Sequence, residues 1–282
     1  MDTKITPTAD NVKEEKKENS EIALLYIKKV TCPVCAHTFD ASVVKSSAYR
    51  ITKKDSDFFI KYSLINPYFY DVWVCNSCGY AAMKTDFNSL RIAEIDQVKK
   101  SISPKWRART YPDIYDVNIA IERYKLSLLN YVVINAKSSK KAINCLKLAW
   151  MYRLMNTPEA VEIELKFLNQ ALVGLNDAYY SEPFPLCGMD KYSVMYLIGE
   201  LNRRTGHPAD SLIWFSNVIT TPNVKQSLKE LARDMKDLIK AEDKKVEITL
   251  LAASESANKS STENTIVQEN VKKAGLFSKF FK

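Results

Sequence analysis

The sequence predicts an α+β fold in which a small antiparallel β module precedes an all-helical domain. Between about residues 22 and 84, aromatic and β-branched residues gather in short runs that are separated by turn residues. Two Cys-x-x-Cys pairs, at residues 32–35 and 75–78, frame most of this stretch. Beyond about Thr85 the apolar residues recur every three or four positions, as in amphipathic helices. We therefore expect a β module at 22–84 and a helical domain at 85–242.

The composition is that of an ordinary globular protein. Of the 282 residues, 46% are hydrophobic, and the net charge of +8 permits an anionic partner without requiring one. The first residues lack the basic start and apolar stretch of a secretory signal. No apolar run approaches the ~20 residues that a membrane-spanning helix needs. We expect a cytoplasmic protein.

Several β-prone runs are expected within the β module. A charged turn at residues 53–57 separates the third run from the fourth, and an Asn66-Pro67 turn precedes the last one. The last run has a period-two pattern and ends at the second cysteine pair. In it, Tyr68, Tyr70, Val72 and Val74 alternate with Phe69, Asp71, Trp73 and Cys75. The runs cover residues 24–30, 39–44, 49–51, 58–62 and 68–75. Together they predict one small antiparallel sheet.

The four paired cysteines, Cys32, Cys35, Cys75 and Cys78, predict a metal site. Each Cys-x-x-Cys turn places two thiolates on the same side, and two such turns supply the four soft ligands of a tetrahedral zinc. A redox pair usually opens a helix in a βαβ unit, whereas both pairs here adjoin strands. Four protein ligands leave no position for water, so we expect one structural Zn²⁺ per chain in a zinc-ribbon-like module. His37 could replace a ligand, but we expect it at the surface.

Helical periodicity predicts consecutive helices with short connections, which is typical of antiparallel neighbours. Asp86 is expected to cap the first of these helices, and Ser103-Pro104 to end it. The further helices are expected at residues 114–136, 139–155, 158–180, 190–205, 208–219 and 224–242.

Two of the helical pairs are similar to tetratricopeptide repeats, helical hairpins that recur every ~34 residues. In the clearer pair, Ile198-Gly199 provide the large apolar residue and the small residue that follows it, and Gly206 lies at the turn. Ser211 and Phe215 occupy the small and aromatic positions of the second helix. The earlier pair, around Leu148-Ala149, matches less well. Such hairpins predict a groove that binds a protein or peptide.

Polar segments are expected to be disordered at both ends of the chain, at residues 1–21 and 243–271. The tip at 272–282 differs, because Leu276, Phe277, Phe280 and Phe281 fall at helical spacing beside lysines. This amphipathic pattern allows three interpretations, one of which is weak peripheral contact with the inner face of an anionic membrane. Docking of the same rings onto the helical domain, or capture by a partner protein, are the alternatives.

RNA binding is an alternative function for the β module. Basic residues there interleave with aromatic ones, as in sheets that stack bases and pair with phosphates. A basic solvent face above an aromatic core explains the same pattern, and four thiolates on one zinc would offset part of its charge. The basic residues are Lys45, Arg50, Lys53, Lys54 and Lys61, and the aromatic ones are Tyr49, Phe58, Phe59 and Tyr62.

Catalytic signals are weak. His37 and His207 are the only histidines, and neither lies in a recognisable nucleophile, metal-hydrolase or phosphate-binding motif. Cys187 lies in an expected loop, which makes a thiol-dependent enzyme the most distant alternative, whereas Cys145 is expected in the core. We expect a non-enzymatic adaptor or scaffold that binds a protein or peptide through its helices.

Four stretches carry a resemblance to a known family. They are residues 29–35, 66–75, 78–82 and 196–204, which include both cysteine pairs and the Tyr196-Leu197-Ile198-Gly199-Glu200-Leu201 run. Over about residues 26–240 the chain resembles the bacterial domain of unknown function 2225 family, common in Firmicutes. The resemblance implies a zinc site at the four cysteines and tetratricopeptide-like helices, but no activity. Ala36 departs from the pattern, because a glycine often follows such a turn.

Overall fold

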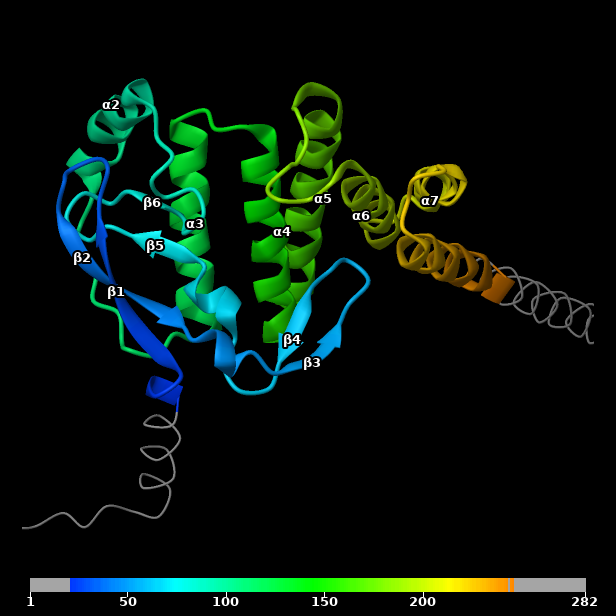
Figure 1. Cartoon of the computed structure of the whole chain (residues 1–282), viewed down its shortest axis with the longest axis horizontal. Helices are drawn as coiled ribbons and strands as arrows, with labels where there is room; N and C mark the ends of the chain where they lie inside the picture. The colour runs from blue at the N-terminus through cyan, green and yellow to red at the C-terminus, as the bar shows by residue number, and fades with distance from the viewer. Residues whose placement is uncertain (1–20, 243, 246–282) are drawn as a thin grey trace, which may run out of the picture.

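The computed structural model describes residues 21–242, 244 and 245. It has the expected α+β order, with β hairpins first along the chain and helices after them (Figure 1). The segments expected to be disordered at 1–21 and 243–271, and the tip at 272–282, lie outside the described residues, apart from residues 21, 244 and 245. No helix in the described part of the chain has both the length and the apolar character needed to cross a membrane.

The strands of the described chain form three separate two-stranded antiparallel sheets, so the expectation of one sheet was wrong. β1 (Leu25–Thr31) pairs with β2 (Thr38–Val44), β3 (Ile51–Lys54) with β4 (Ile60–Tyr62), and β5 (Val72–Val74) with β6 (Ala81–Met83). The β3–β4 hairpin extends toward the helices and away from the other two hairpins (Figure 1). The three hairpins therefore share no ladder of hydrogen bonds.

The expected strand at 68–75 begins instead with a 3₁₀ helix, η2 (Pro67–Tyr70). Pro67 has a fixed φ suited to a first helical position, and the Asn66 side chain accepts a hydrogen bond from the Tyr68 backbone N–H at 3.1 Å. The Tyr70 ring is buried and stacks on Tyr115, with centroids 4.6 Å apart. Local turn chemistry thus overrides the period-two pattern, and only Val72–Val74 is a strand.

The helices match the predicted ranges closely from α3 onward. They are α3 (Val117–Val133), α4 (Ser138–Met155), α5 (Pro158–Ser181), α6 (Lys191–Arg204), α7 (Pro208–Thr220) and helical residues 226–242. Helices α3, α4 and α5 stand side by side, with the β1–β2 and β5–β6 hairpins beside α3, and α6, α7 and the last helix beyond α5 (Figure 1). One hydrophobic cluster runs from the cysteine turns through α3, α4, α5 and α6.

Asp86 does not cap a helix. Helix α2 (Ile92–Ser101) begins six residues later, and the Glu94 carboxylate accepts a hydrogen bond from the Arg91 backbone N–H at 2.7 Å. Asp86 instead accepts a hydrogen bond from the Tyr131 hydroxyl at 2.8 Å and pairs with Lys140 at 3.2 Å. These contacts hold the segment after β6 against α3 and α4.

Close helix contacts occur where the sequence has small residues. A Cβ at Gly199 would lie 2.9 Å from the Phe215 ring, and the Ser211 hydroxyl donates to the Gly199 carbonyl at 2.7 Å. A Cβ at Gly174 on α5 would lie 2.9 Å from the Ala142 Cβ on α4. The missing side chains allow α6 to approach α7, and α4 to approach α5, more closely than larger residues would permit.

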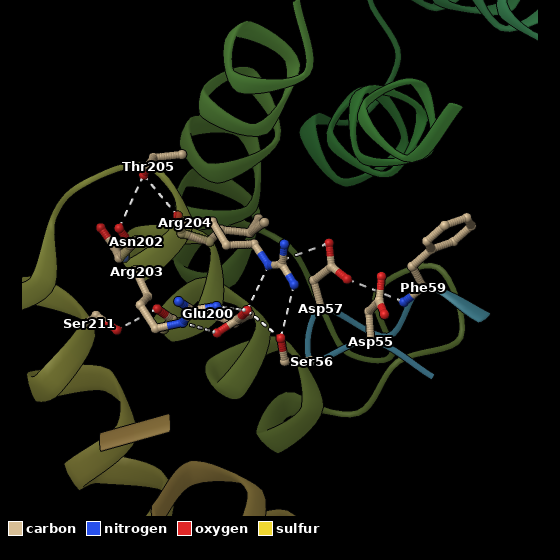
Figure 2. A network of polar contacts seen from close by, with 12 residues as sticks. Asp55, Ser56, Asp57, Phe59, Glu200, Asn202, Arg203, Arg204, Thr205 and Ser211 are labelled. Atoms are coloured by element: carbon tan, nitrogen blue, oxygen red, sulfur yellow. Dashed lines mark hydrogen bonds and ion pairs between the residues drawn. The ribbon is translucent and has the colours of Figure 1, made fainter. Parts of the chain in front are cut away.

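A buried polar network joins the β3–β4 turn to the helices (Figure 2). Asp57 is 0% exposed and accepts hydrogen bonds from both terminal nitrogens of Arg153, at 3.2 and 2.7 Å, and from the Trp150 indole at 3.0 Å. Burial alone would raise the pKa of Asp57, but the hydrogen bonds and charge of Arg153 outweigh it and hold that pKa below its usual range.

The second half of this network lies on α6 (Figure 2). The buried Glu200 carboxylate accepts hydrogen bonds from Arg203 at 2.8 and 2.9 Å and from Arg204 at 2.7 Å. The Ser56 hydroxyl donates to the same carboxylate at 2.6 Å. The turn at residues 55–57 therefore binds α4 through Asp57 and α6 through Ser56.

Candidate metal centre

The two cysteine turns have the same backbone geometry, one after β1 and one after β5. In the first, the Cys32 N–H donates to the His37 carbonyl and the Ala36 N–H to the Cys32 carbonyl, both at 2.9 Å. In the second, the Cys75 N–H donates to the Tyr80 carbonyl at 2.8 Å and the Gly79 N–H to the Cys75 carbonyl at 2.9 Å. These hydrogen bonds place both thiols of each turn on the same side.

The four thiol sulfurs converge, lying within 4.8 Å of one another. The Sγ atoms of Cys32 and Cys78 are 3.6 Å apart, as are those of Cys35 and Cys75. A tetrahedral zinc with Zn–S bonds of about 2.3 Å requires sulfurs about 3.8 Å apart, so the arrangement fits such an ion. His37 is exposed and is not part of the group, as expected from the sequence.

Electrostatics of the group also suit a cation. Hydrogen bonds from the Cys32 and Cys78 thiols lower the pKa of Cys75. The bond to Cys75 raises the pKa of Cys32, and bonds to Cys32 and Cys75 raise the pKa of Cys78. One thiolate is therefore favoured and further ones are opposed. A divalent cation offsets the repulsion among four thiolates and allows all of them to ionise. Cys32, Cys75 and Cys78 are buried and Cys35 is exposed, so the group lies at the edge of the core.

The chain matches the family model described as an uncharacterized protein conserved in bacteria (DUF2225), over residues 25–239. The chain belongs to this family. The match spans both cysteine turns and the helices from α2 to α7, and it confirms the family resemblance carried by the sequence. A search of curated proteins and a search of solved structures each found no match.

Ala36 is the position at which this DUF2225 member departs from the expected glycine. Its φ is +59°, close to the +78° of Gly79 at the equivalent position of the second turn. Gly79 has a further role, because a Cβ there would lie 2.6 Å from the Trp106 ring. The first turn thus keeps the same left-handed geometry with a side chain that opposes it.

We expect Ala36→Gly to stabilise the zinc-loaded protein by about 0.5–1 kcal/mol. Relief of left-handed strain is worth about 1–2 kcal/mol, and the added freedom of glycine in the unfolded chain offsets about half of it. Urea denaturation with zinc present measures the change. Ala108 is the control because its φ is not positive. Ala108→Gly relieves no strain and only adds freedom to the unfolded chain, so it should destabilise the protein slightly. A loss of stability in Ala36→Gly would contradict the strain argument.

The basic residues predicted to face RNA lie on and beside the β3–β4 hairpin, where most have local partners. Lys53 and Lys61 approach Asp55 at 3.8 and 4.0 Å, and the Lys54 ammonium lies 4.8 Å from the centre of the Phe58 ring. Lys45 donates to the Ala23 carbonyl and Arg50 to the Ser47 carbonyl, both at 2.8 Å.

The aromatic residues of that predicted face are divided between core and surface. Phe59 is fully buried and stacks on Trp150, and Phe58 stacks on Tyr196. Tyr49 and Tyr62 lie nearer the surface, edge to face at 5.8 Å. Phe59 therefore belongs to the core and the half-buried Phe58 packs against it, while RNA binding through the basic residues stays a prediction.

The other two cysteines lie apart from the metal group. Cys145 is buried on α4, as predicted, where burial raises its pKa to about 12 and its thiol donates to the Gln170 amide oxygen at 3.5 Å. Cys187 is exposed in the loop between α5 and α6, with a φ of +47°.

One surface beside the second cysteine turn was not predicted from the sequence. Five basic residues, and no acidic one, occur between residues 97 and 112: Lys99, Lys100, Lys105, Arg107 and Arg109. Trp106 lies among them and donates its indole N–H to the Asn76 carbonyl at 2.9 Å. The run of uncompensated positive charge around a tryptophan was the signal available in the sequence.

Proposed function

We propose that this protein is a non-enzymatic adaptor in which one structural Zn²⁺ per chain holds the β module and the helices bind a peptide segment of a partner protein. The observation that carries the proposal is a groove of about 710 Å³ between α3, α4 and α5. Its volume lies within the range of sites that hold compact ligands.

The groove has the character of a peptide site. Ala142 and Gly174 form part of its lining where α4 and α5 approach closely, and Val132 and Val173 present side chains that are 59% and 70% exposed. Lys141 and Asp177 add one charge of each sign. An amphipathic helix with apolar residues at helical spacing is the ligand that such a groove between helices accommodates. The close approach of α6 to α7 at Gly199 agrees with the predicted tetratricopeptide-like pairing and supports a role in protein binding.

Comparative pull-downs test the adaptor function, using tagged full-length protein and lysate of the source cells, with and without nuclease. We expect Val173→Asp to lose specific protein partners, since a carboxylate in the groove opposes an apolar ligand. Ile213→Asp is the matched control, because Ile213 is 60% exposed on α7 and outside the groove. Partners lost by both variants, or recovered only without nuclease, would contradict the proposal.

A further inference from the structure

The basic surface beside the second cysteine turn, formed by residues 99–109, contains a pocket of about 450 Å³. Lys105, Arg107 and Arg109 line its rim. Its apolar walls are Ile102, Trp106, Leu126, Leu129 and Val133. A single cavity therefore combines an apolar interior with a positively charged rim.

Positive charge on this surface is largely uncompensated. Arg109 pairs with Glu122, but Lys99, Lys100, Lys105 and Arg107 form no ion pair with any residue that the structure describes. All of these basic residues are exposed. Cations without protein partners, grouped on one surface, attract an anionic ligand.

The irregular segment that carries Trp106, Arg107 and Arg109 is fixed to the second cysteine turn. The Asn76 side-chain amide donates to the Arg109 carbonyl at 2.8 Å, and the Arg109 N–H donates to the Asn76 Oδ1 at 2.7 Å. With the indole bond from Trp106 to the Asn76 carbonyl, three hydrogen bonds hold the segment at one residue. The basic rim is thus positioned before any ligand arrives, which lowers the entropic cost of binding.

An unused acceptor lies at the same pocket. Asn130 is 1% exposed and lines the cavity, and its amide N–H groups donate to the Leu126 and Gly79 carbonyls at 2.9 and 3.3 Å. Its Oδ1 has no hydrogen-bond partner among the described residues. Buried polar atoms normally have partners, so the wall of the pocket contains an acceptor that its surroundings do not satisfy.

We propose that this surface binds single-stranded nucleic acid, with an unpaired base in the pocket and the backbone phosphates on the basic residues around it. An apolar pocket within a positively charged rim matches a ligand that alternates planar bases with phosphates. A base must be unpaired to enter it, which favours single strands over duplexes. This surface is separate from the hairpin face considered above and from the peptide groove, so the inference goes beyond the adaptor function.

Fluorescence anisotropy with a labelled single-stranded oligoribonucleotide and the zinc-loaded full chain tests the charge requirement. We expect K105E combined with R107E to weaken binding more than tenfold at 50 mM salt. Loss of two phosphate contacts should also reduce the slope of log affinity against log salt by about 1.4. The matched control combines R233E with K240E, an equal charge change at exposed positions of the last helix, and should change affinity less than threefold.

The pocket has its own test. Leu129 is 51% exposed, so Leu129→Ser should fold while removing part of the apolar wall without changing charge. It should weaken binding of the normal oligonucleotide several-fold but leave an abasic oligonucleotide unaffected. Val173→Ser, at an exposed position outside the pocket, is the control.

Three results would overturn the proposal. One is the absence of binding at 50 mM salt, and another is an equal loss of affinity in both charge-reversal variants. The third is displacement of the oligonucleotide by polyglutamate at the same concentration of charge, which would assign the surface to an acidic protein. Circular dichroism and zinc content of each variant confirm that the compared proteins are folded.

Discussion

Replacing Cys75 with serine should abolish stoichiometric zinc and unfold both cysteine turns, whereas the wild-type protein purified without chelator should contain one zinc per chain. Structural zinc contributes on the order of 10 kcal/mol in small Cys-rich sites, which is comparable to the whole stability of a domain. Cys75 is 0% exposed, so the serine also leaves a polar group in the core. Elemental analysis measures the zinc, and thermal unfolding measures the loss of stability.

Cys75→Ser should disturb the structure most near the metal site. Strands β5 and β6 pack against α3, where the Tyr131 hydroxyl accepts a hydrogen bond from the Met83 N–H at 3.2 Å. We therefore expect near-ultraviolet circular dichroism from the aromatic residues around β5 to be lost while most far-ultraviolet helical signal remains. Cys187→Ser removes a thiol outside the group and should keep the full zinc content. Stoichiometric zinc in Cys75→Ser, or none in the wild type, would contradict the site.

Local signals account for what the sequence predicts well. The Cys-x-x-Cys spacing defines both turns, and α5 begins at the predicted residue, Pro158, after the Thr157 cap. Each of these signals acts within a few residues. The order of hairpins and helices, the four-thiol group and most helix ranges follow from them.

Long-range contacts account for the features that the sequence does not predict. Asp86 had the appearance of a cap, but Tyr131, 45 residues later, binds its carboxylate. The segment at residues 53–57 was predicted only as a charged turn, yet Arg153, 96 residues beyond Asp57, binds that carboxylate in the core. Side chains that meet across such distances leave no periodic pattern in the sequence, and the pocket beside Trp106 arises in the same way.

The buried contact between the β3–β4 turn and α4 leads to a second large expected effect. Asp57→Ala should destabilise the protein by about 3–5 kcal/mol, because removing one partner of a buried ion pair leaves the other charge incompletely compensated. Arg153 would retain Glu164 at 2.7 Å and Asp55 at 3.3 Å, but the Trp150 indole would lose its acceptor. Urea denaturation measures the change. Asp40→Ala, which removes an exposed pair with Lys29, is the control and should cost at most about 1 kcal/mol.

The pH dependence of the stability difference between wild type and Asp57→Ala provides a further check on the Asp57–Arg153 ion pair. The pKa of Asp57 is lower in the folded protein than its unfolded value of about 3.9. Its contribution is therefore fully present above about pH 4 and is lost as the pH falls through the folded pKa. The stability gap between wild type and Asp57→Ala should accordingly be constant from pH 5 to 7 and shrink below pH 4. A gap under 1 kcal/mol at pH 7, or one that widens in acid, would show that Asp57 and Arg153 do not hold the hairpin against α4.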